Sequence, residues 1–256
     1  ASYTFDSDSE ITAVTPAGAA GIVDVEVTTA GGTATASGAY TYAFAPILSN
    51  VSPVAGPESG GATVTVTGAN LAGATNVTFG GNAATSFAID SDTQITATTP
   101  AGTVGAADVE VVTAGGTATA AGAYTYVAAP TISSVSPVAG PDVGGTAVSI
   151  FGTNLTNATS VTFGGAAAAS YTIDSDVKIT ATTPAGTAGA ADVSVVTVGG
   201  TATAAAAYAF FSAPTISSVS PAAGPVAGGA TVTVVGANLT DATNVTFGGV
   251  PAASYT

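Results

Sequence analysis

The sequence has 256 residues, of which 15 are Asp or Glu and 1 is Lys or Arg, and it contains no His, Cys, Met or Trp. These absences exclude a His base, a Cys nucleophile, an imidazole or thiolate metal site and a disulfide framework. A formal charge of -14 excludes nucleic acid and anionic membrane surfaces as partners, because both are bound through many Lys and Arg side chains. No apolar run approaches the roughly 20 residues that span a bilayer, so we expect no membrane insertion.

The whole chain repeats itself with a period of 84 residues. The dipeptide Ala-Pro recurs at Ala45, Ala129 and Ala213, and the motif VTFGG recurs with the same spacing. Residues 45–128 and 129–212 are identical at about two-thirds of their positions, and no insertion is needed to align them. A fixed period of this length indicates an array of similar domains.

The period divides the chain into four parts. Residues 45–128 and 129–212 are complete repeats, residues 1–44 correspond to the C-terminal half of a repeat, and residues 213–256 correspond to the N-terminal half. About 40 residues are too few to bury a core of their own. We therefore expect either that the sequence is an excerpt of a longer array or that half-repeats of successive molecules complete each other.

Each repeat reads as an all-β domain. Short runs rich in Val, Ile, Thr, Tyr and Phe alternate with Gly, Pro, Asn and Asp every 8 to 12 residues or so, which is typical of a β-sandwich. Seven strands, the number of a small immunoglobulin-like domain, are predicted near Ile47–Ser52, Ala62–Thr67, Asn76–Phe79, Thr85–Ile89, Gln94–Thr98, Ala107–Thr113 and Thr117–Tyr126.

Glycine pairs are expected to form the turns, because tight connections require positive φ angles. They occur at Gly60-Gly61, Gly80-Gly81 and Gly115-Gly116, and the last pair predicts a hairpin. Apolar residues alternate with polar or small ones on both sides of this hairpin, so each strand has one buried face. The predicted core residues are Val109, Val111, Ala118, Ala120, Phe79, Phe87, Tyr124 and Tyr126.

The connections between repeats are short. Only Val127, Ala128 and Ala129 separate Tyr126 from the Pro130 that opens the next repeat, too few for a flexible linker. We therefore expect the array to be a stiff rod in which each domain adds roughly 35 to 45 Å.

The sequence resembles the IPT/TIG domain, the immunoglobulin-like fold shared by plexins and transcription factors. Its motifs are an opening Pro, a first strand ending in Ser-Pro, a Gly-Gly before the second strand, a G-x-N-L turn, a V-x-F-G-G strand and a Thr-Pro. They occur here at Pro130, Ser136-Pro137, Gly144-Gly145, Gly152 to Leu155, Val161 to Gly165 and Thr183-Pro184. The resemblance covers the whole chain and implies a fold rather than a chemistry. The nearly identical tandem copies are similar to the repeat stalks of bacterial surface proteins and adhesins.

The Asp-Ser-Asp triplets are the strongest candidate site. They lie at Asp6 to Asp8, Asp90 to Asp92 and Asp174 to Asp176, and two carboxylates so close together could contribute oxygen ligands to calcium. Asp24, Asp108 and Asp192 are the candidates for further ligands. The other interpretation is a polar turn in which Asp and Ser bond to the local backbone.

Other candidate sites are weaker. A carboxylate pair for glycoside hydrolysis would recur in every copy, whereas an active site is a single constellation, so no catalytic residue, cofactor or metal site is assigned. Lys178 stands where the other copies have Glu10 and Gln94, which argues against a Lys–Asn isopeptide bond in every domain. Glycosylation sequons begin at Asn50, Asn76, Asn154, Asn157, Asn238 and Asn244.

The sequence thus predicts a non-enzymatic, extracellular structural protein that forms a stalk or filament at a microbial cell surface. Its partners would be copies of itself or the rest of a longer array. The alternative is an adhesin module that recognises carbohydrate or a host protein through its loops. Loop variation concentrates at Glu58-Ser59, Asp142-Val143 and Val226-Ala227, which favours the structural role.

Overall fold

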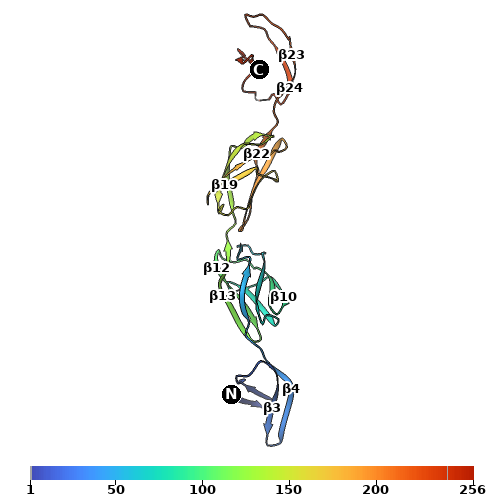
Figure 1. Ribbon diagram of the computed structural model, residues 1–256, viewed down its shortest axis with the longest axis vertical. Coiled ribbons are helices and arrows are strands. Elements are labelled where there is room, and N and C mark those ends of the chain that lie inside the picture. Colours follow the sequence, from blue (N-terminus) through green and yellow to red (C-terminus); the bar gives the residue numbers. More distant parts are fainter. Residues whose placement is uncertain (1, 241) are drawn as a thin grey trace. The chain divides into compact units, whose positions relative to one another are not determined.

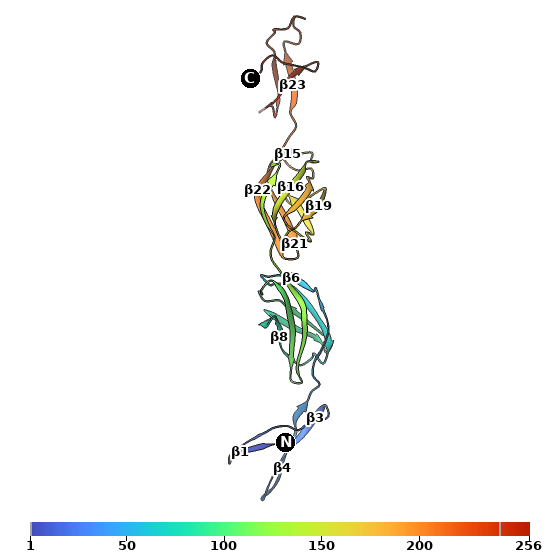
Figure 2. The same ribbon diagram turned by 90° about the vertical axis from the view of Figure 1, so that its left-hand side faces the viewer.

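The computed structural model describes residues 2–240 and 242–256 and shows an all-β protein, as predicted. The chain divides into two compact units, Ala1–Ala128 and Ala129–Thr256. Among the described residues there is no helical segment capable of crossing a bilayer. Each unit contains one complete repeat and one half-repeat (Figures 1 and 2).

The complete repeat of the first unit is a sandwich of two sheets (Figure 2). One sheet has the order β10-β11-β7-β5 and the other the order β6-β13-β12-β8-β9. The nine strands are β5 (Ile47–Ser52), β6 (Ala55–Pro57), β7 (Thr63–Ala69), β8 (Ala74–Phe79), β9 (Asn82–Ala83), β10 (Ser86–Ser91), β11 (Gln94–Thr98), β12 (Gly105–Thr113) and β13 (Gly116–Val127).

The alternating sequence determines which side of each strand is buried. Strand β7 begins with Thr63, which is exposed, whereas the side chains of Val64 and Val66 are fully buried. Strand β11 pairs with β7 so that Ile95 lies opposite Val66. Because side chains alternate along a strand, this register places the Val and Ile side chains inside and the Thr hydroxyls outside.

Aromatic rings from the second sheet fill the centre of the sandwich. Phe79, Tyr124 and Tyr126 are at most 1% exposed. The ring centroids of Phe79 and Tyr124 lie 5.4 Å apart, and those of Tyr124 and Tyr126 lie 5.1 Å apart, both in edge-to-face geometry. The predicted core is confirmed for these residues and for Val109 and Val111, while Phe87 is only partly buried against it.

The second unit repeats this sandwich with the sheet orders β14-β16-β20-β19 and β15-β22-β21-β17-β18. Its strands are β14 (Thr131–Ser136), β15 (Ala139–Pro141), β16 (Ala147–Thr153), β17 (Ser160–Phe163), β18 (Ala166–Ala167), β19 (Ser170–Ser175), β20 (Lys178–Thr182), β21 (Gly189–Thr197) and β22 (Gly200–Phe211).

The predicted number of seven strands is wrong, because each complete repeat has nine. The missed strands β6 and β9 have three and two residues. Strand β6 contains Gly56 and Pro57, which read as loop residues, and it is held by parallel pairing with β13. Pairing between segments distant in the sequence thus creates strands that local patterns do not indicate.

The predicted positive φ angles are confirmed at Gly60, Gly61, Gly80, Gly81 and Gly116, but Gly115 does not have one. At this position the glycine has another role. A Cβ atom there would lie 2.0 Å from the carbonyl oxygen of Phe44, in the segment that enters the repeat. The hairpin tip and the entering chain therefore approach each other closely, and only glycine leaves room for this approach.

Each half-repeat has most of the strands of the corresponding half of a complete repeat, although residues 223–225 do not form an equivalent of β6. Residues 2–44 form β1 (Tyr3–Ser7), β2 (Glu10–Ala13), β3 (Gly21–Thr29) and β4 (Gly32–Tyr42). In the segment 213–256 the strands are β23 (Thr215–Ser220), β24 (Thr233–Ala237), β25 (Thr246–Phe247) and β26 (Val250–Pro251). These strands pair only in hairpin-like couples, and their apolar side chains are largely exposed.

Candidate functional site

The Asp-Ser-Asp triplets lie in the hairpin turns β1–β2, β10–β11 and β19–β20. In the second of these the carboxylate of Asp90 accepts hydrogen bonds from Thr96 Oγ1 at 2.7 Å and from Gln94 Nε2 at 3.0 Å. These two bonds, the Thr96 bond first, lower the pKa of Asp90 below its ordinary value because they stabilise the charged form. The first carboxylate of the triplet is therefore engaged with its own hairpin.

The second aspartate of the triplet binds a neighbouring turn, first through its backbone. The backbone carbonyl oxygen of Asp92 accepts the N–H of Leu71 at 2.9 Å, and that of Asp176 accepts the N–H of Leu155 at 2.9 Å. The side chain of Asp176 also accepts a bond from Thr156 Oγ1 at 2.9 Å, which is the main reason that its pKa is lowered. The triplet thus fastens the G-x-N-L turn to the hairpin.

The further candidates Asp24, Asp108 and Asp192 lie in the other sheet, on β3, β12 and β21. At a bulge in each case, Asp24 accepts the backbone N–H of Gly38 at 2.7 Å, Asp108 that of Gly122 at 2.7 Å and Asp192 that of Ala206 at 2.8 Å. All three donor residues have positive φ angles. The structure therefore does not bring these carboxylates to the triplets, and it assigns them a part in holding the bulges.

Calcium binding receives no support from this arrangement. Within residues 2–240 and 242–256, no group of three or more acidic side chains is placed to hold a metal ion. Calcium needs six to eight oxygen ligands, and the triplet carboxylates already accept hydrogen bonds from the protein. The geometry favours the polar-turn interpretation of the triplets.

The single lysine forms an exposed ion pair. Lys178 Nζ lies 3.1 Å from Asp174 Oδ2, four residues earlier in the same hairpin. The pKa of Asp174 is lowered, first by the hydroxyl of Thr180 at 2.6 Å and then by Lys178. An exposed pair of this kind contributes little to stability, because solvent screens the two charges.

The segment that enters each repeat is held by an asparagine of the G-x-N-L turn. The side-chain nitrogens of Asn70, Asn154 and Asn238 donate to the carbonyl oxygens of Ala45, Ala129 and Ala213 at 3.0, 2.8 and 3.1 Å. All three asparagines have positive φ angles between 55° and 61°. The same contact therefore recurs in each copy, including the half-repeat at residues 213–256.

The segment that leaves each complete repeat is fixed as well. The N–H of Glu58 donates to the carbonyl oxygen of Val127 at 2.9 Å, and Asp142 does the same for Phe211 at 2.9 Å. In the second repeat Ser212 Oγ also donates to Asp142 Oδ2 at 2.6 Å. Positions 58 and 142, at which the copies differ, thus bond to the connecting chain through their backbone N–H groups.

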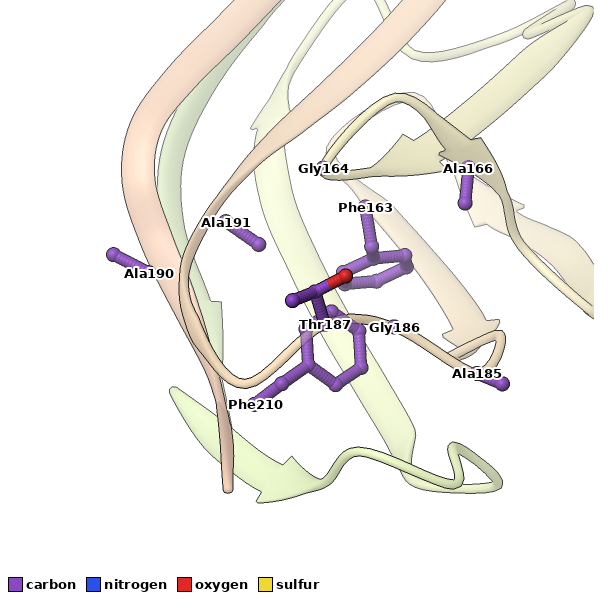
Figure 3. Close-up of a pocket in the computed structure, with 9 residues that line it drawn as sticks. All are labelled: Phe163, Gly164, Ala166, Ala185, Gly186, Thr187, Ala190, Ala191 and Phe210. Atoms are coloured by element: carbon purple, nitrogen blue, oxygen red, sulfur yellow. The ribbon is translucent and has the colours of Figure 1, made fainter. Parts of the chain in front are cut away.

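A shallow hollow of about 470 Å³ lies at one end of the second repeat (Figure 3). The rings of Phe163 and Phe210 lie at its base, and Figure 3 shows Thr187 beside them. The remaining lining residues are small: Gly164, Ala166, Ala185, Gly186, Ala190 and Ala191. None of these nine lining residues has an ionisable side chain. The hollow therefore offers no general acid or base and no group that would activate the Thr187 hydroxyl as a nucleophile.

Comparison with known families agrees with this architecture. The sequence model of the IPT/TIG domain matches residues 46–126, 130–211 and 214–256, which is well over half of the chain. The chain belongs to the IPT/TIG family. The last match covers a half-repeat, whose strands β23 and β24 pair as β14 and β16 do in the complete repeat.

Several solved structures are similar to this IPT/TIG chain. The extracellular region of plexin A4 is 26% identical with a TM-score of 0.45, and the match covers 69% of this chain and 16% of that one. The protein SGBP-B from a xyloglucan utilization locus of Bacteroides uniformis is 22% identical with a TM-score of 0.31, and the match covers 64% and 49%. The chain thus spans about half or less of their length. No curated protein matches the sequence.

The sequence marked Asn154 only as part of the family's turn motif, and Asn154 and Asn238 as the first residues of glycosylation sequons. In the IPT/TIG repeats the amides of Asn154 and Asn238 are already bonded to the entering chain, whereas those of Asn50, Asn157 and Asn244 belong to exposed residues. The signal that could have revealed the junction role is the recurrence of Asn exactly 25 residues after each Ala-Pro alanine.

Proposed function

We propose that this protein is a non-enzymatic, extracellular structural protein that forms a stalk or filament at a microbial cell surface. The observation that carries the proposal is the contact between Asn and the entering chain, repeated in three copies. A short connection whose carbonyl oxygen is bonded to the following domain has few conformations left. Such a junction supports a stiff spacer made of identical units.

The composition supports the absence of catalysis. The sequence has no His or Cys, and its single cation, Lys178, is paired with Asp174. The acidic side chains that recur in each copy serve the turns and bulges described above. An extended structural array requires no further chemistry from these residues.

The surface supports a location outside the cell. Only 6% of the residues are charged, and Thr side chains occupy the outer faces of strands such as β7 and β11. Trypsin-like proteases have a single cleavage site, at Lys178. Both features suit a protein that persists in an environment containing proteases.

The alternative of a binding module acting through its loops is less well supported. At the variable positions 58 and 142 the backbone N–H groups donate to the connecting chain, and the carboxylate of Asp142 accepts a bond from Ser212, so position 142 is engaged with the chain itself. At the other variable positions Val143 and Val226 are strongly exposed apolar residues. A glycan array probed with the labelled chain tests this alternative, and specific binding by the two complete repeats would favour it.

Small-angle X-ray scattering of the full chain tests the structural role. The reference is a variant with a ten-residue Gly-Ser insert between Ala128 and Ala129, which makes this connection flexible. We expect the unmodified chain to show a less flexible scattering profile than the insert variant. Identical flexibility of the two chains would contradict the proposal.

A further inference from the structure

We propose that the parallel strand pair of each complete repeat, β6 with β13 and β15 with β22, is the contact that resists unfolding when the chain is pulled along its length. The inference deepens the proposed structural role and rests on it, because a stalk at a cell surface carries tension. It also assigns to the contact between Ser212 and Asp142 a specific effect, a higher resistance of the second repeat.

The two strands of each pair run in the same direction, although one lies near the start of its repeat and the other ends it. In the first repeat Ala55 of β6 pairs with Thr125, and Pro57 pairs with Val127, the last residue of β13. Strands β15 and β22 of the second repeat pair in the same way (Figure 2).

This direction decides how tension acts on the pair. Tension pulls β6 toward the start of the chain and β13 toward its end. Because the strands are parallel, these two pulls oppose each other along the strand axis, and the hydrogen bonds between the strands are loaded together. In an antiparallel pair of such strands both pulls would act at one end, and the bonds would break one after another.

Backbone hydrogen bonds hold the pair at both of its ends. The N–H of Thr125 donates to the carbonyl oxygen of Val54 at 2.8 Å, and the N–H of Glu58 donates to that of Val127 at 2.9 Å. The equivalent bonds of the second repeat, at 2.8 and 2.9 Å, run from Ala209 to Val138 and from Asp142 to Phe211. The contact is therefore the same in both complete repeats.

The strand that precedes β6 receives the load first. Strand β5 pairs with β7 in the opposite sheet, and the side chain of Asn70 holds Ala45 ahead of it at 3.0 Å. Detachment of β5 would leave β6 paired with β13, because these two strands belong to the other sheet. The parallel pair is thus the last contact between the entering and the leaving chain.

The second repeat has one contact at this place that the first lacks. Ser212 directly follows β22 and Asp142 directly follows β15, and Ser212 Oγ donates to Asp142 Oδ2 at 2.6 Å. The equivalent residues of the first repeat are Ala128 and Glu58, and alanine has no hydroxyl to donate. A bond to a charged acceptor is stronger than one between neutral groups. The second repeat should therefore unfold at a higher force than the first.

Single-molecule force spectroscopy of the full chain tests the inference. The variants Ala43→Cys and Ala213→Cys give attachment points at exposed residues on either side of the two complete repeats, in a chain without other cysteines. We expect two unfolding events at different forces. Ser212→Ala should lower the higher force to that of the other event, with an unfolding rate at constant force that rises roughly tenfold.

Ser170→Ala is the matched control for the loss of a serine hydroxyl. Ser170 Oγ donates to Thr182 Oγ1 at 3.1 Å, between strands that lie outside the parallel pair. This variant should leave both unfolding forces unchanged.

A gain of resistance tests the same contact without a destabilising change. The double variant Glu58→Asp, Ala128→Ser gives the first repeat the residues of the second at both positions. It should raise the lower of the two forces to the higher one. Glu58→Asp alone is the control, because the hydroxyl donor is still missing.

A change of pulling direction tests the parallel pair itself. Attachment at Ala43→Cys and Ala114→Cys pulls β13 from the hairpin turn before its first residue, so β6 and β13 are no longer drawn in opposite directions. The first repeat should then unfold at a lower force than when it is pulled from its ends.

Four results would overturn the inference. They are a single unfolding force in the unmodified chain, equal effects of Ser212→Ala and Ser170→Ala, a first repeat that the double variant leaves unchanged, and equal forces in the two pulling directions. None of these results would contradict the proposed spacer role, which concerns bending at the junctions without load and is tested by scattering with the Gly-Ser insert.

Discussion

The hydroxyl of Tyr126 donates a hydrogen bond of 2.9 Å to the carbonyl oxygen of Pro100. The same bond joins Tyr42 to Pro16 at 2.7 Å in the first half-repeat. In the second complete repeat the equivalent residue is Phe210, which lies at the base of the hollow in Figure 3 and has no hydroxyl. The two nearly identical repeats therefore differ by one hydrogen bond at this place.

We predict that Phe210→Tyr stabilises the second repeat and that Tyr126→Phe destabilises the first, each by about 0.5 to 1.5 kcal/mol, the net value of one hydrogen bond. Hydrogen exchange followed by mass spectrometry measures the two repeats separately, because their peptides differ in mass. Each variant should leave the protection of the other repeat unchanged. A loss of protection in Phe210→Tyr would contradict the account.

The buried hydroxyl of Tyr124 gives a second prediction. Among the described residues no donor or acceptor lies in good hydrogen-bond geometry to it, and a Cβ atom added at Gly56 would clash with it. Burial raises the pKa of Tyr124, and a weak interaction with the Thr99 hydroxyl, whose geometry falls short of a hydrogen bond, offsets part of this effect. We expect Tyr124→Phe to be neutral or stabilising by up to about 1 kcal/mol, because it removes an unsatisfied polar group.

Gly56→Ala should destabilise the first repeat by about 1 to 3 kcal/mol through overpacking, and Tyr124→Phe should recover part of this loss in the double variant. Gly73→Ala is the matched control, since nothing lies within 4 Å of a Cβ atom there. The measurement is again the hydrogen-exchange protection of each repeat. Strictly additive effects of the two variants would show that the hydroxyl does not fill the space beside Gly56.

The third prediction concerns pH. The pKa of Asp174 is lowered in the folded protein, so its carboxylate contributes stability above the unfolded pKa of about 4, and this contribution disappears as the pH falls through the folded value. The Thr180 bond is the largest single cause, so Thr180→Val should raise this pKa toward its ordinary value. Carboxyl ¹³C chemical shifts measured against pH give the pKa, with the unmodified chain as the reference. An unchanged pKa of Asp174 in Thr180→Val would contradict the role of this bond.

The fourth prediction is that calcium leaves the Asp-Ser-Asp turns unchanged. Their carboxylates accept protein hydrogen bonds, among them the 2.7 Å bond from Thr96 to Asp90. Millimolar calcium and an excess of chelator should therefore give the same hydrogen-exchange protection around residues 90–93 and 174–177. Magnesium at the same ionic strength is the control for screening. Protection that increases with calcium alone would revive the calcium site.

Much of the fold followed from the sequence because its signals are local and repeated. The alternation of apolar residues with polar or small ones on both sides of the Gly115-Gly116 hairpin predicted which side faces the core, as the burial of Val109 and Val111 confirms. The 84-residue period predicted that both complete repeats have the same sheets. The buried positions of Phe79, Tyr124 and Tyr126 were predicted for the same reason.

What the sequence did not reveal depends on contacts between distant segments. Strand β6 exists because it pairs with β13, and Gly115 is needed because the hairpin tip approaches Phe44. The bond from Asn154 to Ala129 spans 25 residues and leaves no local pattern except its recurrence. For the Asp-Ser-Asp triplets, the sequence left two interpretations open, a calcium site and a polar turn. The hydrogen bonds that the carboxylates accept from the protein favour the polar turn.

The stiffness of the junction is tested most directly by the distance distribution between spin labels on equivalent residues of the two complete repeats. The Cys-free chain allows Ala83→Cys and Ala167→Cys, both exposed and on the short strands β9 and β18, to be labelled alone. If the junction is stiff as proposed, pulsed dipolar spectroscopy should give one narrow peak. Asn154→Ala should broaden this peak, because it removes the bond to Ala129, whereas Asn157→Ala should not. A broad distribution in the unmodified chain, matching that of the Gly-Ser insert, would contradict the account.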